Sequence, residues 1–200
     1  MSGKLRLTPR DPSSIPGFRS PGAGFEAPFD MLAACHERIT GMLALLAKLP
    51  AHVAAHGTGE PARRAASDVM RYFDLAAPLH HQDEELHVFP PLLAGPDAAM
   101  RALVLRLQQD HRNMEAAWVE ARRTLSSIAE GAESAPAPLI EADRKALAEF
   151  SALYEAHLAA EDTLVYPRAQ GAFTPAALQA MSADMMQRRG ACVPLPKSGV

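Results

Sequence analysis

Apolar residues recur every three to four positions through four long stretches of the chain, with short Gly- and Pro-containing segments between them. This period matches one face of an α-helix rather than the two-residue alternation of a β-strand. The pattern predicts helices over about residues 29–50, 61–93, 97–130 and 139–170. Long helices joined by short connections predict an up-down-up-down four-helix bundle, so the expected fold class is all-α.

A fifth, shorter helix is expected after the bundle. Thr174 and Pro175 suit the N-cap and the first helical position, and Gly190 suits the residue just beyond the C-terminal end. Residues 1–28 hold five prolines among Gly and Ser, a composition typical of a flexible arm. The expected organisation is an arm over 1–28, the bundle over 29–170, and a short C-terminal helix with a tail over 171–200.

Composition narrows the class of protein. The 200 residues suit one domain, and 6% aromatic content with few β-branched runs disfavours sheets. Twenty Lys and Arg against 23 Asp and Glu give a net charge of -3. The chain therefore lacks the excess of basic residues that binds nucleic acids and anionic membranes. We therefore expect neither a nucleic-acid nor a membrane partner.

Location and redox chemistry can also be predicted. The first 25 residues lack the apolar run of a secretory signal, and no run approaches the roughly 18 uninterrupted apolar residues of a membrane span. A cytoplasmic location is expected. Cys35 and Cys192 form no CxxC pair, so any bound metal must be held by nitrogen and oxygen atoms.

The second and fourth predicted helices repeat one motif, HHQDEELHVFP over residues 80–90 and HLAAEDTLVYP over residues 157–167. Counted from the first histidine, both have Glu at +4, an acidic residue at +5, Val at +8, an aromatic residue at +9 and Pro at +10. The first and third helices each add one histidine in phase with the apolar face, His36 and His111. The bundle is thus predicted to consist of two similar hairpins with one inward histidine per helix.

Histidine and glutamate four residues apart lie on the same helix face, with Cβ atoms about 5–6 Å apart. The imidazole can bind one metal ion while the carboxylate reaches a second, and carboxylates can bridge ions about 3.5–4 Å apart. His111 and Glu115 are a third such pair, although Glu115 could instead support a ligand or face solvent. The candidate metal ligands are His36, His80, Glu84, His111, Glu115, His157 and Glu161.

His81 and Glu85 also have ligand spacing. The match between the two motifs favours His80 and Glu84 as the ligand pair, which makes His81 and Glu85 flanking groups beside the ligands. His87, one turn beyond Glu84, is a further group that could contact the site.

The ordered pattern of His36, His80-x-x-x-Glu84, His111 and His157-x-x-x-Glu161 resembles the hemerythrin-like (HHE cation-binding) family over about residues 29–170. The resemblance implies a non-haem di-iron centre that binds or reacts with oxygen, peroxide or nitric oxide. It also implies four histidines as terminal ligands and two glutamates as bridges between the irons. An oxo or hydroxo bridge from solvent would complete the pair of iron cofactors.

The sequence departs from the family's oxygen carriers at Glu115, where they have a second histidine, and at Glu161, which stands four rather than five residues after its histidine and replaces an aspartate. The arm also lacks the cysteine of the family's iron-centre repair proteins. These departures disfavour both reversible oxygen carriage and iron-centre repair.

Three functions are compatible with the pattern. The preferred one is a binding or sensing protein whose di-iron site takes up a small oxidant, with weak peroxide or oxidase activity as a side reaction. The second is a di-iron oxidase, peroxide-consuming enzyme or iron-handling protein, but such sites use mainly carboxylates with Glu-x-x-His spacing. The third is a structural bundle that holds zinc or no metal. The pattern leaves the oligomeric state open.

Overall fold

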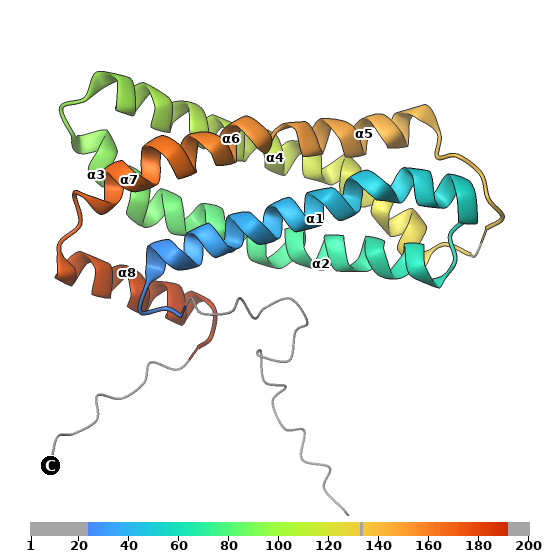
Figure 1. The fold of residues 1–200 in the computed structure, drawn as a ribbon, viewed down its shortest axis with the longest axis horizontal. Coiled ribbons are helices and arrows are strands. Elements are labelled where there is room, and N and C mark those ends of the chain that lie inside the picture. Colours follow the sequence, from blue (N-terminus) through green and yellow to red (C-terminus); the bar gives the residue numbers. More distant parts are fainter. Residues whose placement is uncertain (1–23, 133, 192–200) are drawn as a thin grey trace, which may run out of the picture.

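The computed structural model describes residues 24–132 and 134–191, and these residues form helices and no strand (Figure 1). The predicted all-α class and helical bundle are confirmed. The elements are α1 (Pro28–His56), α2 (Glu60–Asp83), η2 (Glu84–Val88), α3 (Phe89–Ala94), α4 (Ala98–Glu130), α5 (Glu141–Ala152), α6 (Glu155–Ala160), η3 (Glu161–Val165), α7 (Tyr166–Gln170) and α8 (Pro175–Arg188).

These elements build four rods that pack side by side (Figure 1). The first rod is α1 and the third is α4, whereas α2–η2–α3 and α5–α6–η3–α7 follow each other closely enough to form the second and fourth. Each rod therefore corresponds to one of the four predicted helices. Most of the predicted arm, residues 1–23, and residues 192–200 of the tail lie outside the described residues.

The first helix does not end at Pro50, as predicted, but runs on to His56. A proline inside a helix removes one backbone hydrogen bond, which normally ends or kinks the helix. Here Leu49 and Val53 on either side of Pro50 are only 2% and 3% exposed, so core packing continues across it. The helix ends at Gly57, whose φ of 76° places it in the left-handed region that glycine adopts readily.

Side-chain caps begin the third rod and the last helix. The Asp97 carboxylate accepts hydrogen bonds from the backbone N–H groups of Ala99 and Met100, at 3.0 and 3.1 Å, and so caps α4. The Thr174 hydroxyl accepts from the N–H of Ala177 at 3.2 Å and caps α8. These oxygens satisfy donors that have no partner within the first turn of a helix.

The second and fourth rods each contain one π-helical turn, which the sequence pattern did not predict. These turns, η2 (Glu84–Val88) and η3 (Glu161–Val165), begin at the glutamate of the repeated motif. In both, the N–H of the residue after the turn bonds to the carbonyl of that glutamate, five residues earlier. Single π-helical turns of this kind are frequent at functional sites.

The repeated prolines account for these turns. Pro90 and Pro167 each stand two residues beyond the π-helical turn. In an α-helix, the ring of a proline clashes with the carbonyl four residues earlier, which in both rods lies inside the turn. The wider turn moves that carbonyl away from the ring, so the rod continues past the proline.

Two apolar clusters fill the bundle and leave a polar layer between them. One cluster includes Ile39, Phe73 and Met114, and the other includes Leu32 and Val88. Along every rod, the histidine of the predicted site falls between members of the two clusters. The polar layer is thus enclosed on both sides by packed apolar side chains.

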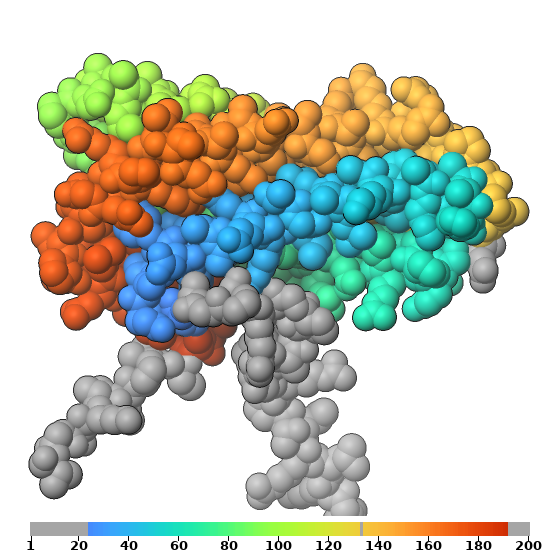
Figure 2. Space-filling view, viewed as in Figure 1, coloured from blue at the N-terminus to red at the C-terminus, as the bar shows by residue number. Residues whose placement is uncertain are grey.

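The helix α8 lies across one end of the bundle, outside the four rods (Figures 1 and 2). Met181 and Met185 are fully buried and join the apolar cluster at that end. Next to them, Arg188 and Arg189 bind the fully buried Asp83 carboxylate, at 2.6 and 2.5 Å. Because Asp83 immediately precedes Glu84, this pair of arginines fixes α8 beside the π-helical turn of the second rod.

By length and composition alone, α1 could cross a membrane, although no single run of apolar residues predicted this. The core helix of a soluble protein satisfies the same criterion. In the bundle, Leu32, Ile39 and Leu46 of α1 are at most 1% exposed, while 22% of its most apolar window is buried.

Candidate metal centre

One histidine from each rod points into the polar layer. His36 of α1, His80 of α2, His111 of α4 and His157 of α6 are at most 4% exposed. Their Nε2 atoms meet in pairs, 3.0 Å apart between His36 and His80 and 3.2 Å apart between His111 and His157. Each pair joins the two rods of one hairpin.

Two fully buried carboxylates span the space between the pairs. Glu84 places Oε1 3.5 Å from Nε2 of His80 and Oε2 3.5 Å from Nε2 of His111. Glu161 places Oε2 3.3 Å from Nε2 of His36 and Oε1 3.1 Å from Nε2 of His157. Each glutamate therefore offers one oxygen to each pair of histidines, as a bridging ligand would.

These donors form two groups that could hold a metal ion, within which the donor atoms lie no more than 4.8 Å from one another. Metal–ligand bonds of about 2.0–2.2 Å place neighbouring donors about 2.8–3.1 Å apart at an octahedral ion and about 3.3–3.6 Å apart at a tetrahedral one. The distances above are close to that spacing. The groups are His36, His80, Glu84 and Glu161, and then Glu84, His111, His157 and Glu161.

The two buried carboxylates make few hydrogen bonds. Among the described residues, Oε2 of Glu84 and both oxygens of Glu161 are buried without a hydrogen-bond partner. An unpaired buried carboxylate is strongly destabilising unless a cation or a donor compensates it. Three of these oxygens have no hydrogen-bond partner within the described part of the chain, and every donor is a nitrogen or an oxygen. The site therefore fits hard or borderline metal cations such as iron or zinc.

Acidic residues at +5 of the motif orient two of the histidines. Nδ1 of His36 hydrogen-bonds to Asp162 at 2.7 Å, and Nδ1 of His111 hydrogen-bonds to Glu85 at 2.9 Å. Both bonds cross from one hairpin to the other. Such carboxylate partners fix the ring and leave Nε2 free for a metal. The sequence placed Glu85 beside the ligands, which agrees, but assigned Asp162 no role.

Protonation balances the charges of the site when no cation is present. Burial disfavours the charged form of His36, but the Glu161 and Glu84 carboxylates outweigh it and raise the pKa of His36 to about 10. The same opposition, with Glu84 as the main partner, raises the pKa of His111 to about 9. Burial lowers the pKa of His80 to about 3. Near neutral pH, His36 and His111 are therefore protonated, and their two positive charges balance the two glutamate carboxylates.

Tyr166 is a site residue that sequence reasoning missed. Its ring stacks on His36, with centroids 5.1 Å apart, and its hydroxyl lies 2.9 Å from Nε2 of His36. The same hydroxyl donates a hydrogen bond to Oε1 of Glu84. Burial and the nearby Glu84 and Glu161 raise the pKa of Tyr166 well above its usual value, so without a cation the phenol keeps its proton.

The corresponding residue of the other hairpin is Phe89, also at +9 of its motif. Its ring stacks on His111, with centroids 5.7 Å apart and planes 21° from parallel. The two halves thus share the same aromatic stack on a histidine, and only one half adds a hydroxyl.

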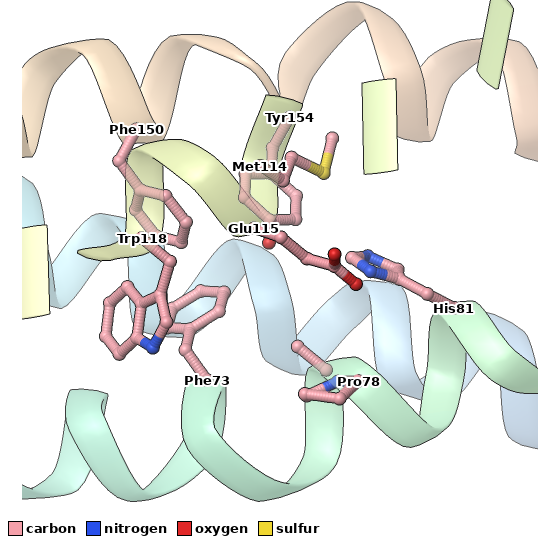
Figure 3. Close-up of a pocket in the computed structure, with 9 residues that line it drawn as sticks. Phe73, Pro78, His81, Met114, Glu115, Trp118, Phe150 and Tyr154 are labelled. Atoms are coloured by element: carbon pink, nitrogen blue, oxygen red, sulfur yellow. The ribbon is translucent and has the colours of Figure 1, made fainter. Parts of the chain in front are cut away.

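Glu115 does not join the donors, although the sequence made it a candidate ligand. Its side chain is exposed and belongs to neither group of donors. It lies instead at a small pocket that His81, Trp118 and Phe73 help to line, with its carboxylate pointing toward His81 (Figure 3). The structure therefore brings together six of the seven predicted ligands and places Glu115 apart from them.

Three other residues that the sequence places near the ligands do not join the donors. His81 is buried and stacks on His111 with ring centroids 4.0 Å apart. His87 turns outward to Asp184 of α8, 2.7 Å away. Cys35 is a free buried thiol whose pKa burial raises to about 11, so it stays protonated and is a poor metal ligand.

The fold and this cluster define a helical-bundle protein with a cation site built from histidines and glutamates. The chain matches the hemerythrin HHE cation-binding domain over residues 27–169, and it belongs to that family. A protein of Haemophilus influenzae (strain ATCC 51907 / DSM 11121 / KW20 / Rd), described as an uncharacterized protein, is 29% identical over 145 residues. That match covers 71% of this chain and 78% of the relative.

Proposed function

We propose that this protein binds two iron ions and uses them to bind or sense a small oxidant such as oxygen, nitric oxide or peroxide. Membership of the HHE family implies cation binding. The observation that carries the di-iron proposal is the pair of spanning glutamates, each of which offers one oxygen to each pair of histidines. Donors shared in this way suit two adjacent ions better than one.

The donor set favours an iron centre that does not act as a strong oxidant. Each proposed ion has two imidazole nitrogens and two carboxylate oxygens, so neutral donors are as numerous as charged ones. Iron bound there would supply redox chemistry and open coordination positions for a small molecule. The chain's own residues hold the ions, orient two imidazoles through Asp162 and Glu85, and exclude bulk water by burial.

The pocket beside His81 supports a ligand of very few atoms. It measures about 50 Å³ and is lined mainly by apolar side chains, including Phe73, Met114 and Trp118. One water needs about 10–15 Å³ of such space, so a diatomic molecule or peroxide fits. His81 both lines the pocket and stacks on His111, which brings the pocket next to the proposed iron site.

A cytoplasmic location is part of the proposal, because the free thiol of Cys35 agrees with a reducing compartment. The proposed partner is the small oxidant, with neither a nucleic acid nor a membrane as a partner.

The test is anaerobic loading with ferrous iron, followed by exposure to oxygen, nitric oxide or peroxide while absorbance is recorded. We expect saturation at two irons per chain and a spectral change complete at about one oxidant per iron pair. Saturation at one ion would contradict the di-iron proposal. Sustained turnover of many equivalents of peroxide would make the protein an enzyme instead, and preference for zinc with no response to oxidants would make the metal structural.

Neighbouring histidines provide a test of the ligand assignment. His80→Ala removes a donor of the first group and should lower bound iron from about two to about one or fewer per chain. His81→Ala removes a ring that stacks on His111 and should keep both ions. Iron is measured by elemental analysis after desalting. Equal losses in both variants would contradict the assignment of His80 over His81.

A further inference from the structure

We propose that the Tyr166 hydroxyl is a seventh protein ligand, bound to the ion held by His36 and His80, and that it directs small oxidants to the other ion. This inference rests on the proposed function, because it concerns the same two ions. The evidence for it is one difference between two otherwise similar halves of the site: Tyr166 has a hydroxyl, whereas Phe89 at the equivalent position has none.

The position of the hydroxyl is that of a ligand in the first group of donors. Its oxygen lies 2.9 Å from Nε2 of His36, which matches the roughly 2.8–3.1 Å between neighbouring ligands of a six-coordinate ion. It also contacts Oε1 of Glu84, the glutamate oxygen nearest to His80. The hydroxyl therefore touches two atoms that the first ion would bind.

Packing holds Tyr166 in this place. Its ring is only 5% exposed and stacks on His36 at 20° from parallel. Phe29 of α1 packs against it edge-on, with centroids 6.0 Å apart. A fixed ring of this kind needs little rearrangement to bind an ion, which favours coordination over a purely structural hydrogen bond.

Coordination by a phenol is ordinary iron chemistry, as tyrosine-ligated haem proteins show. The phenolic O–H bond is replaced by an iron–oxygen bond, and the proton passes to solvent, as protons generally do when ligands bind metals. The negative charge gained helps to neutralise two buried ferric ions. No change in the oxidation state of the tyrosine is involved.

Counting donors shows the consequence. Each ion would have two histidine nitrogens and one oxygen from each glutamate, which makes four protein ligands. A shared solvent bridge would add a fifth to both. Tyr166 completes six at the first ion, whereas Phe89 supplies nothing at the second. The open position therefore belongs to the ion of His111 and His157, on whose side His81 and its pocket lie.

The experiment uses the full chain loaded with iron and oxidised to the diferric state. We expect a visible phenolate-to-iron(III) charge-transfer band and the matching ring vibrations in resonance Raman spectra. Tyr166→Phe keeps the ring stack, so it should retain two irons and lose the band. Of the remaining tyrosines, Tyr72 donates to the backbone carbonyl of Cys35, and Tyr154 packs against Phe150 and His81, so neither is expected to supply it.

Phe89→Tyr is the matched variant, because it places a hydroxyl at the equivalent point of the other half. It should strengthen the phenolate band and weaken azide binding to the diferric protein at least about tenfold, since it fills the open position. Azide binding should persist in Tyr166→Phe.

The outcomes separate this proposal from the one on which it rests. A diferric protein with two irons and no phenolate band, or a band that survives in Tyr166→Phe, overturns the role of Tyr166 alone. Unchanged azide binding in Phe89→Tyr overturns the placement of the open position. A chain that takes up no second iron overturns the di-iron proposal and this one together.

Discussion

Replacing Glu161 by glutamine is expected to empty both halves of the metal site. The carboxylate offers one oxygen to the group of His36 and the other to the group of His157, so a single change removes a charged donor from both ions. Changes to outer partners of metal ligands typically weaken binding by about 10–100-fold. Loss of a shared ligand should exceed that range. Elemental analysis and competition with a chelator measure the effect.

Glu115→Gln is the matched control. Glu115 also stands four residues after a histidine, yet its exposed side chain lies outside both groups of donors. The control should keep two irons per chain with unchanged affinity. Loss of iron from the Glu115 variant, or retention of both ions in the Glu161 variant, would contradict the ligand set described above.

Removal of metal is expected to lower the melting temperature by about 15–30 °C. An ion present at about a thousand times its Kd stabilises the folded state by about 4 kcal/mol, and two ions double this. For a chain of this size, each kcal/mol corresponds to about 2–4 °C. Circular dichroism melts of the iron-loaded protein, with and without a chelator, measure the shift. A difference below about 5 °C would contradict tight binding at this site.

The metal-free protein should also lose stability as the pH rises from 7 to 10. The pKa values of His36 and His111 are raised in the folded chain, to about 10 and about 9, from an ordinary value of about 6.5. Their protonation therefore stabilises the fold fully below about pH 6.5, and this contribution disappears as the pH passes 9 and 10.

In the proposed site, metal would occupy the same nitrogen atoms, so the loaded protein should lack this part of the pH dependence, and metal affinity should rise over the same range. Melts at pH 7, 8, 9 and 10 compare the two forms. Replacing both His36 and His111 by glutamine should flatten the curve of the metal-free protein. A metal-free melting temperature that stays constant or rises from pH 7 to 9 would contradict the charge balance of the site.

The repeated motif made most of the site predictable from the sequence. Helical spacing and the match between its two copies placed His80 and His157 on inward faces and paired each with the glutamate one turn later. The structure brings these four residues together with His36 and His111. Spacing alone could not place Glu115, because the same i, i+4 relation holds whether a side chain points into the bundle or toward its surface.

Tyr166 escaped prediction because the rods are not uniform helices. At about 100° per residue, a residue nine positions after His157 points to the opposite side of an α-helix. The π-helical turn η3 adds one residue to a turn, which sets the following residues back by about 100°. Tyr166 thereby comes to lie on the side of Glu161. The signal in the sequence was the proline at +10, repeated in both motifs.

The crossed bonds between the hairpins have a consequence for how the site can form during synthesis. Asp162 orients His36, and Glu85 orients His111, so in each hairpin the orientation of one imidazole depends on a carboxylate of the other hairpin. The ribosome releases His36, His80 and Glu84 long before Glu161 has been synthesised. A nascent chain therefore offers a cation only part of one group of donors. Both groups of donors include residues of both hairpins, so a chain interrupted before its fourth rod lacks a complete group of donors.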